Sequence, residues 1–219
     1  MLTLETMTRL FPHAPTCAHL AFVQAREPLA AAGLLEPGWR MPFFLAQLGH
    51  ESDGLRRTTE NLIFSRASRI ARVWPTRFRT PVSARPYVRN PRALAEKVYG
   101  NRPELGNLQP GDGARFIGRG YLQITGRANY RAMGLHIGID LEAEPERAAE
   151  PEVAVQIACA FWSENGLNAA CDAGRFAAAT RRINGGLTGY EDRMDWLEQA
   201  IACLDWPMPP GAAPLDLTP

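Results

Sequence analysis

The sequence lacks the patterns that mark several large classes of protein. No stretch of its 219 residues reaches the roughly 18 uninterrupted apolar residues of a membrane span, because charged residues and a proline break the longest candidate, 17–35. The N-terminus has Glu5 and no basic segment, so we expect no signal peptide. No C-x-x-C pair occurs and the four histidines are scattered, which predicts free, buried thiols and no metal site. The cysteines are Cys17, Cys159, Cys171 and Cys203.

Motifs for nucleotide and acyl chemistry are also missing. The glycine-rich segment 111–120 contains no G-K-[ST] sequence and follows no apolar strand, so it is not a phosphate-binding loop. There is no G-x-S-x-G nucleophile elbow and no Cys–His pair with a local signature. We therefore expect no metal or organic cofactor.

The charge is balanced over the whole chain but not along it. Hydrophobic residues make up 46% and charged residues 21%, with a net charge of +1, which excludes a disordered chain and a globally basic nucleic-acid binder. Residues 51–131 nevertheless carry 16 basic and 6 acidic residues, whereas residues 132–219 carry 5 and 14. The basic middle indicates either a surface for a polyanion or charge pairing between the two halves of one fold.

Helical periodicity dominates the chain. We expect helices from 2–10, from Thr16, over 41–51, from Ser65, from Asn90, from Pro151, from Asp172 to residue 182, and in the last apolar stretch to residue 204. Only residues 111–124 are typical of strand and turn. The sequence thus predicts a mainly α-helical single domain, 1–206, in two lobes with a small β-hairpin, followed by a loosely held, proline-rich tail, 207–219.

Glu51 is the first candidate for chemistry. It ends the helix expected over 41–51, where Phe44, Leu48 and Glu51 share one stripe. Apolar surroundings and the negative pole of the helix both favour a protonated carboxyl, which a general acid needs. The alternative is a solvated glutamate in a frayed last turn.

Glu60 is the second candidate. It lies nine residues further on, in a polar stretch flanked by arginines that favour its ionised form. Two carboxyls in opposed environments divide the acid and base roles in glycoside hydrolysis. Glutamates nine residues apart are common, so this spacing alone is a weak signal.

Several longer motifs make the sequence similar to a known family. They occur in the order seen in family 19 of the glycoside hydrolases, and they look most like the phage endolysin branch of that chitinase-like, lysozyme-like family. The resemblance covers roughly residues 40–204 and implies a substrate cleft between two α-helical lobes. The motifs are GHES (49–52), TENL (59–62), EKVYGNR (96–102), GDGARFIGRGYLQITGRANY (111–130), FWSENG (161–166), INGG (183–186) and GYEDR (189–193).

The resemblance implies a role for each of the three catalytic candidates. Glu51 matches the general acid in the family's H-E motif. Glu60, in the E-N-L turn, matches the general base of the endolysin branch, although in plant chitinases the base lies further along the chain. Thr125 matches a hydroxyl that holds the attacking water; because it precedes a short helical run, helix capping is its other possible role.

The resemblance also implies substrate-binding residues. These are His50, Tyr121, Gln123, Asn184 and Arg193, with Asn184 as a sugar-amide or base-side contact and Arg193 as a residue that tunes the base. A simple turn at Asn184 and a surface ion pair at Arg193 are the structural alternatives. Plant enzymes have an acidic residue shortly after the asparagine, where this sequence has Thr188.

The favoured function is inverting hydrolysis of the β-1,4 glycan backbone of peptidoglycan, for lysis of a bacterial host. We expect the protein to bind peptidoglycan strands and no nucleic acid. We also expect it to be a monomer that does not insert stably into a membrane. The protein would collect in the host cytoplasm until a membrane pore opens. A chitinase, a lytic transglycosylase and a non-catalytic module that binds glycan or nucleic acid are the alternatives.

Overall fold

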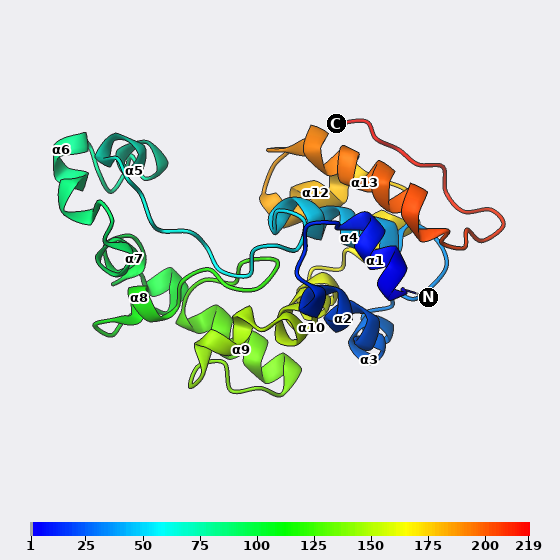
Figure 1. Cartoon of the computed structure of the whole chain (residues 1–219), viewed down its shortest axis with the longest axis horizontal. Helices are drawn as coiled ribbons and strands as arrows, with labels where there is room; N and C mark the ends of the chain where they lie inside the picture. Colours follow the sequence, from blue (N-terminus) through cyan, green and yellow to red (C-terminus); the bar gives the residue numbers. More distant parts are fainter. Residues whose placement is uncertain (1) are drawn as a thin grey trace. The chain divides into compact units, whose positions relative to one another are not determined.

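The computed structural model describes residues 2–219 and confirms the mainly α-helical fold (Figure 1). The expected hairpin is much shorter than a pair of regular strands. In the described residues β-pairing is confined to isolated bridges. The antiparallel bridge between Arg119 and Ile124 marks the hairpin, and a second antiparallel bridge pairs Arg119 with Thr59. Among residues 2–219, no helix is both long and apolar enough to cross a membrane.

Thirteen α-helices and three short 3₁₀-helices follow one another along the described chain. The α-helices are α1 (Leu4–Leu10), α2 (Thr16–Gln24), α3 (Arg26–Ala31), α4 (Arg40–Glu51), α5 (Ala67–Val73), α6 (Pro81–Ala84), α7 (Pro91–Tyr99), α8 (Asp112–Arg115), α9 (Arg127–Ile137), α10 (Pro151–Glu164), α11 (Asn168–Asp172), α12 (Phe176–Asn184) and α13 (Tyr190–Leu204). The 3₁₀-helices are η1 (Arg85–Tyr87), η2 (Pro103–Leu105) and η3 (Pro145–Ala149).

The chain divides into two compact units. Unit 1 comprises residues 1–58, 120–122 and 148–219, and unit 2 comprises residues 59–119 and 123–147. Unit 1 is therefore assembled from segments far apart in the sequence. Unit 2 holds 15 basic and 8 acidic residues, so the charge asymmetry of the sequence becomes an asymmetry between the units.

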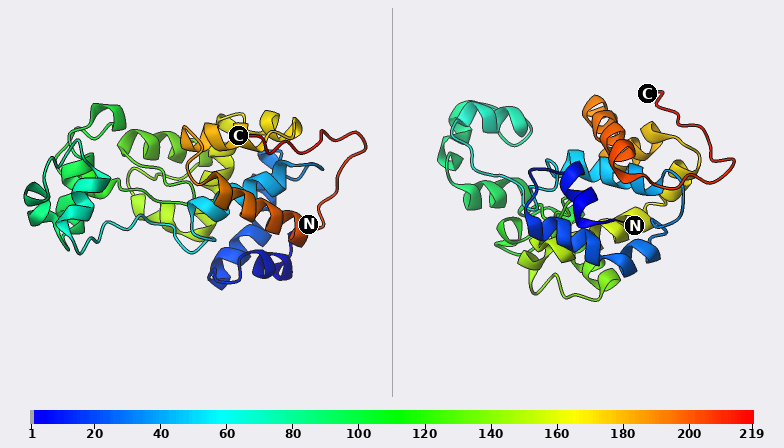
Figure 2. Two further views of the ribbon diagram at one scale, coloured as in Figure 1. Left: turned by 90° about the horizontal axis from the view of Figure 1, so that it is seen from above. Right: turned by 45° about the vertical axis from the view of Figure 1, so that its right-hand side comes forward.

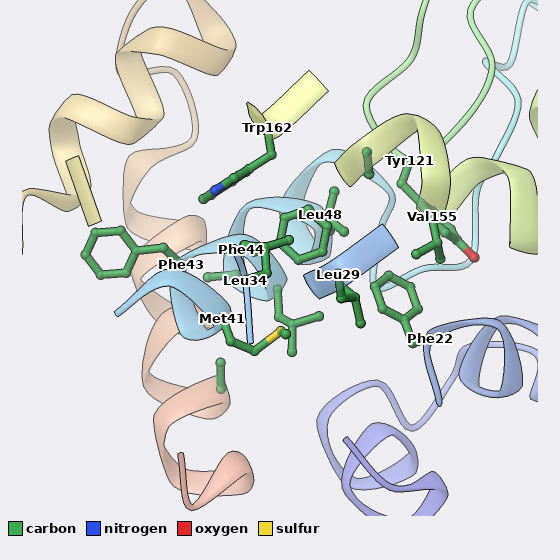
Figure 3. Packing of buried hydrophobic residues seen from close by; sticks show 14 of the residues in the cluster. Phe22, Leu29, Leu34, Met41, Phe43, Phe44, Leu48, Tyr121, Val155 and Trp162 are labelled. Atoms are coloured by element: carbon green, nitrogen blue, oxygen red, sulfur yellow. The ribbon is translucent and has the colours of Figure 1, made fainter. Parts of the chain in front are cut away.

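Helix α4 lies at the centre of unit 1. Its residues 41–49 are all buried. Phe43 packs edge-on against Phe176, and Phe44 packs edge-on against Trp162 (Figure 3). Helix α13 packs along α4 (Figure 1), and α10 packs against α2 and α3. A helix that is apolar on nearly every side is stable only when it is enclosed in this way, and its enclosure fixes the position of Glu51 at its end.

Unit 2 has a smaller core of its own. In that core α5 packs against α6 and α7 against α8, around Ile70, Phe78, Leu94 and Val98. Helix α7 begins as its sequence predicts, because the Asn90 side chain accepts a hydrogen bond from the Ala93 amide and a proline follows at the first helical position.

Two expectations about the C-terminal third are wrong. Asp172 does not cap a helix; it is the last residue of α11, where its carboxylate accepts two hydrogen bonds of 2.7 Å from Arg40. The tail is not loose either. It leaves the end of α13 and turns back along unit 1 (Figure 2), where the Asp216 amide donates to Gly174 and the Tyr190 hydroxyl donates to the Leu217 carbonyl.

Candidate active site

Glu51 is the last residue of α4, and its side chain is 24% exposed. The close approach of α13 defines its surroundings. At Gly49 a β-carbon would lie 2.6 Å from the Trp196 ring, so only a glycine permits this contact. The approach brings Arg193, three residues before Trp196, to the carboxyl of Glu51.

Arg193 binds Glu51 directly. Its Nη2 donates to Glu51 Oε1 at 2.5 Å, and its side chain is only 1% exposed. We expected Arg193 to tune the base and to bind substrate; its side chain is too buried to reach substrate, and the carboxylate that it binds is that of Glu51. The carboxyl expected in apolar surroundings is thus in an ion pair.

A chain of buried hydrogen bonds holds Arg193 in place. Its Nη1 donates to Gln47 Oε1, and Gln47 Nε2 donates to Thr180 Oγ1 at 2.8 Å. Gln47 and Thr180 have no exposed surface. The network connects α12, α4 and α13 and ends at Glu51, so it restricts the rotamers of Arg193. In this network Arg193 Nε is a buried donor with no acceptor among the described residues.

His50 and Asn184 also lie in unit 1. His50 Nδ1 is 2.6 Å from Asp192 Oδ2, and the imidazole lies so close to Gly189 that a β-carbon there would be 2.2 Å from it. Asn184, the last residue of α12, is exposed and donates to the Thr188 carbonyl at 3.4 Å. The structure therefore brings His50, Glu51 and Arg193 together, whereas no hydrogen bond within residues 2–219 connects the Asn184 side chain to them.

Glu60 belongs to unit 2 and is half-buried. Its Oε1 accepts a 2.5 Å hydrogen bond from the Gly118 amide, and its Oε2 accepts one of 2.8 Å from the Tyr99 hydroxyl. Burial raises the pKa of Tyr99 well above its ordinary value, as does the neighbouring Glu60, so Tyr99 remains a donor. Tyr99 was missed as a site residue, although its motif, EKVYGNR, offered the signal.

Gln123 lies beside Glu60 in the same unit. A β-carbon at Gly118 would be 2.7 Å from Gln123 Oε1 and 3.2 Å from Glu60 Oε1, so both side chains border this glycine. Gln123 has a φ of 53°, a left-handed conformation unusual for a residue with a side chain. The tight turn around the bridge between Arg119 and Ile124 therefore places the Gln123 amide beside the Glu60 carboxylate.

Thr125 is half-buried at the end of this turn. Its Oγ1 donates to the Gln123 carbonyl at 3.3 Å, and no side chain caps α9, whose N-cap residue is Gly126. Helix capping by Thr125 is therefore wrong. The turn places Thr125 in the same unit as Glu60.

Tyr121 is not a substrate contact. It has no exposed surface and packs on Phe22, with ring centroids 5.7 Å apart (Figure 3). Its hydroxyl is buried and has no partner among the described residues. The sequence predicts strand and turn around Tyr121, but its side chain belongs to the core of unit 1.

A pocket of about 400 Å³ opens beside Glu60 within unit 2. Its lining combines the carboxylate with an amide and an arginine, groups that bind hydroxyls and acyl groups of a polar ligand. The lining residues are Thr59, Glu60, Asn61, Leu62, Ile63, Pro91, Arg92, Ala95, Ala114 and Ile117.

The two candidate carboxyls are not accompanied by a cluster of metal ligands or by a disulfide among the described residues. Across residues 2–219, no group of three or more histidine, cysteine or acidic side chains is arranged to hold a metal ion. All four cysteines are free; Cys159 and Cys171 are buried, which raises the pKa of both thiols, whereas Cys17 is exposed and Cys203 half-buried.

Comparisons with known proteins point to one family. No family model matches the chain. A Haemophilus influenzae protein described as a glycosyl hydrolase family 19 domain-containing protein is 34% identical over 193 residues, 88% of this chain and 92% of that protein. An Arabidopsis thaliana endochitinase is 44% identical over 75 residues, 34% of this chain but only 26% of the plant enzyme. Chitinase C from Streptomyces griseus has the same fold, with a TM-score of 0.69, 20% identity and coverage of 97% of this chain and 80% of that chain.

Proposed function

The chain belongs to family 19 of the glycoside hydrolases, and we propose that it hydrolyses β-1,4 bonds of an N-acetylated glycan with inversion, using Glu51 as the acid and Glu60 as the base. The observation that supports this assignment is that both candidate carboxyls are held in place by hydrogen bonds from the protein. Arg193 binds Glu51, and the Gly118 amide and Tyr99 bind Glu60.

Glu51 would protonate the leaving oxygen of the glycosidic bond. Its Oε1 accepts the hydrogen bond from Arg193, which leaves Oε2 as the oxygen that carries the proton to the substrate. The buried side chain of Gln47 fixes Arg193, so the carboxyl is held in one orientation. A positioned general acid contributes on the order of 10² to 10⁴ in rate.

Glu60 would accept a proton from the attacking water. Each of its oxygens accepts one hydrogen bond from the protein and retains a further lone pair, so the carboxylate can bind a water while it stays in place. Gln123 lies beside it to bind the sugar, and Thr125 would hold the water with its hydroxyl. Direct attack of this water on the glycosidic carbon inverts its configuration and needs no covalent intermediate.

Peptidoglycan is the proposed polymer. The support is electrostatic: unit 2, which contains Glu60, has 15 basic and 8 acidic residues, and peptidoglycan carries carboxylates on its peptides and lactyl groups. A positive surface concentrates such a polymer near the site. Chitin is the second candidate, because the Arabidopsis and Streptomyces proteins are chitinases by name.

Mass spectrometry of the products separates these substrates. We expect peptidoglycan fragments with ordinary reducing ends, formed faster than fragments of chitin oligosaccharides. Products with 1,6-anhydro ends would indicate a lytic transglycosylase instead, and binding without cleavage would indicate a non-catalytic module.

The Glu51→Gln variant tests the acid. We expect it to fold and to lose turnover by a factor on the order of 10² to 10⁴. A folded Gln variant with nearly normal turnover would refute the role of Glu51.

We further propose that this hydrolysis serves lysis of a bacterial host by a phage or prophage, with release through a membrane pore. The support is the likeness of the motifs to the endolysin branch. Expression in a bacterium with and without a pore-forming protein tests it: lysis is expected only when the pore is present.

A further inference from the structure

Unit 2 has an unusually uniform positive surface between residues 61 and 95. No acidic residue occurs in this segment, and its eight arginines are all exposed. Within residues 2–219 none of the eight takes part in an ion pair. We call them the arginine surface: Arg66, Arg69, Arg72, Arg77, Arg79, Arg85, Arg89 and Arg92.

Helix α5 gathers three of these arginines around a hollow. Its Ile70 is fully buried in the core of unit 2, whereas Arg69 and Arg72 on the helix and Arg66 just before it are exposed. With Ser65 and Ser68 they line a pocket of about 490 Å³. Three arginines and two serines therefore line one pocket.

This set of groups fits carboxylates. A guanidinium donates two parallel hydrogen bonds to a carboxylate, and the serine hydroxyls add further donors. Like charges held close together repel one another when no counter-charge is present. An anionic ligand relieves that repulsion, so the pocket favours a ligand that brings several negative groups.

The arginine surface continues into the pocket beside Glu60. Arg92, at the start of α7, and Ile63, just before α5, both line that pocket. Arg92 therefore belongs both to the arginine surface and to the lining of the pocket beside Glu60. This continuity favours the substrate polymer over a membrane as the occupant.

We propose that the α5 pocket is a second, non-catalytic site that binds carboxylates of the peptidoglycan peptides and lactyl groups and holds the polymer while Glu60 acts elsewhere on it. The proposal rests on the proposed function, because it takes peptidoglycan as the substrate. It assigns Arg66, Arg69 and Arg72 to retention of the insoluble polymer and gives them no part in bond cleavage.

Binding to purified sacculi tests the site. In the Glu51→Gln background, which does not digest the polymer, the additional changes Arg66→Gln, Arg69→Gln and Arg72→Gln should weaken sedimentation with sacculi about tenfold at low salt, as three exposed ion pairs imply. The same three positions changed to lysine should give intermediate binding, because the charge remains and the paired hydrogen bonds do not. Salt should weaken the parent more than the Gln variant.

Matched controls distinguish binding at the α5 pocket from a general effect of the protein's net charge. Arg175→Gln, Arg181→Gln and Arg182→Gln remove three exposed arginines from unit 1 and should leave binding within twofold of the parent. Equal binding by the α5 Gln variant, or equal loss in the unit 1 control, would overturn the proposal. Binding to vesicles of phosphatidylglycerol but not to sacculi would overturn it in favour of a membrane.

Activity distinguishes failure of this site from failure of the proposed function. With Glu51 intact, the α5 Gln variant should cleave soluble glycan fragments at the wild-type rate and lose activity only on sacculi, through a raised KM. Wild-type protein that cleaves chitin but not peptidoglycan would refute the proposed substrate. Sedimentation with sacculi would then still decide whether the pocket binds that polymer.

Discussion

Gln47 offers the sharpest test of the network behind Glu51. The substitution Gln47→Met keeps the length of the side chain and a good helix former, but it removes both polar groups. Arg193 Nη1 then loses its acceptor, and Thr180 Oγ1 loses its donor. Since Arg193 Nε already has no acceptor among the described residues, two buried guanidinium nitrogens would be left without partners.

The magnitude follows from these lost contacts. An unsatisfied buried donor costs about 1–3 kcal/mol, and more on a charged group, so we expect the free energy of unfolding to fall by about 3 kcal/mol. For a domain of this size that corresponds to a decrease in Tm of roughly 6–12 °C. Arg193 would keep only its bond to Glu51, and a carboxyl displaced by about 1 Å lowers kcat by up to about 10². KM should change little.

The assay combines denaturant unfolding with steady-state kinetics. Gln199→Met is the matched control, because Gln199 is exposed on α13, and it should stay within about 0.5 kcal/mol of wild type. Adding Thr180→Val to Gln47→Met should cost less than the two single losses together, since both partners of one bond are then apolar. A Gln47→Met protein with wild-type stability and kcat would refute the reasoning.

Three further predictions concern unit 2. Thr125→Val should lower kcat more than it raises KM, and proton NMR should show the α-anomer as the first product of wild type; an initial β-anomer would refute inversion. Gly118→Ala should reduce turnover, because the new methyl group meets Gln123 and Glu60; unchanged kinetics would contradict that placement. Arg131 and Arg127 hold the pKa of Glu142 at about 2. The stabilisation from this lowered pKa is complete above about pH 4.5 and is lost as the pH falls toward 2. Arg131→Gln should therefore flatten the dependence of Tm on pH in that range. An unchanged slope would refute the linkage.

Local signals explain what the sequence predicts well. The start of α7 depends on an asparagine and a proline that are adjacent in the chain, and the end of α4 depends on residues within one turn of Glu51. Such signals do not depend on distant residues, so the helices and the two candidate carboxyls can be predicted from the sequence.

Long-range packing explains what the sequence does not predict. Arg193 and Glu51 are 142 residues apart, and Gln47 and Thr180 are 133 apart, so no local pattern indicates that they meet. Tyr121 lies in a segment typical of strand and turn, but its side chain packs on Phe22. The tail has the composition of a loose end, yet its backbone pairs with Gly174.

The discontinuity of unit 1 has a consequence for the order in which the nascent protein folds. Helix α4 leaves the ribosome early, but α13, which covers it, is made only after all of residues 59–147. Until then the apolar sides of α4 lack their final partners. Unit 2 takes nearly all of its residues from one stretch, so it can fold while synthesis continues. Contacts that close such long loops form slowly, and exposed apolar helices aggregate. We therefore expect slower synthesis or a chaperone that shields α4 to raise the yield of folded protein.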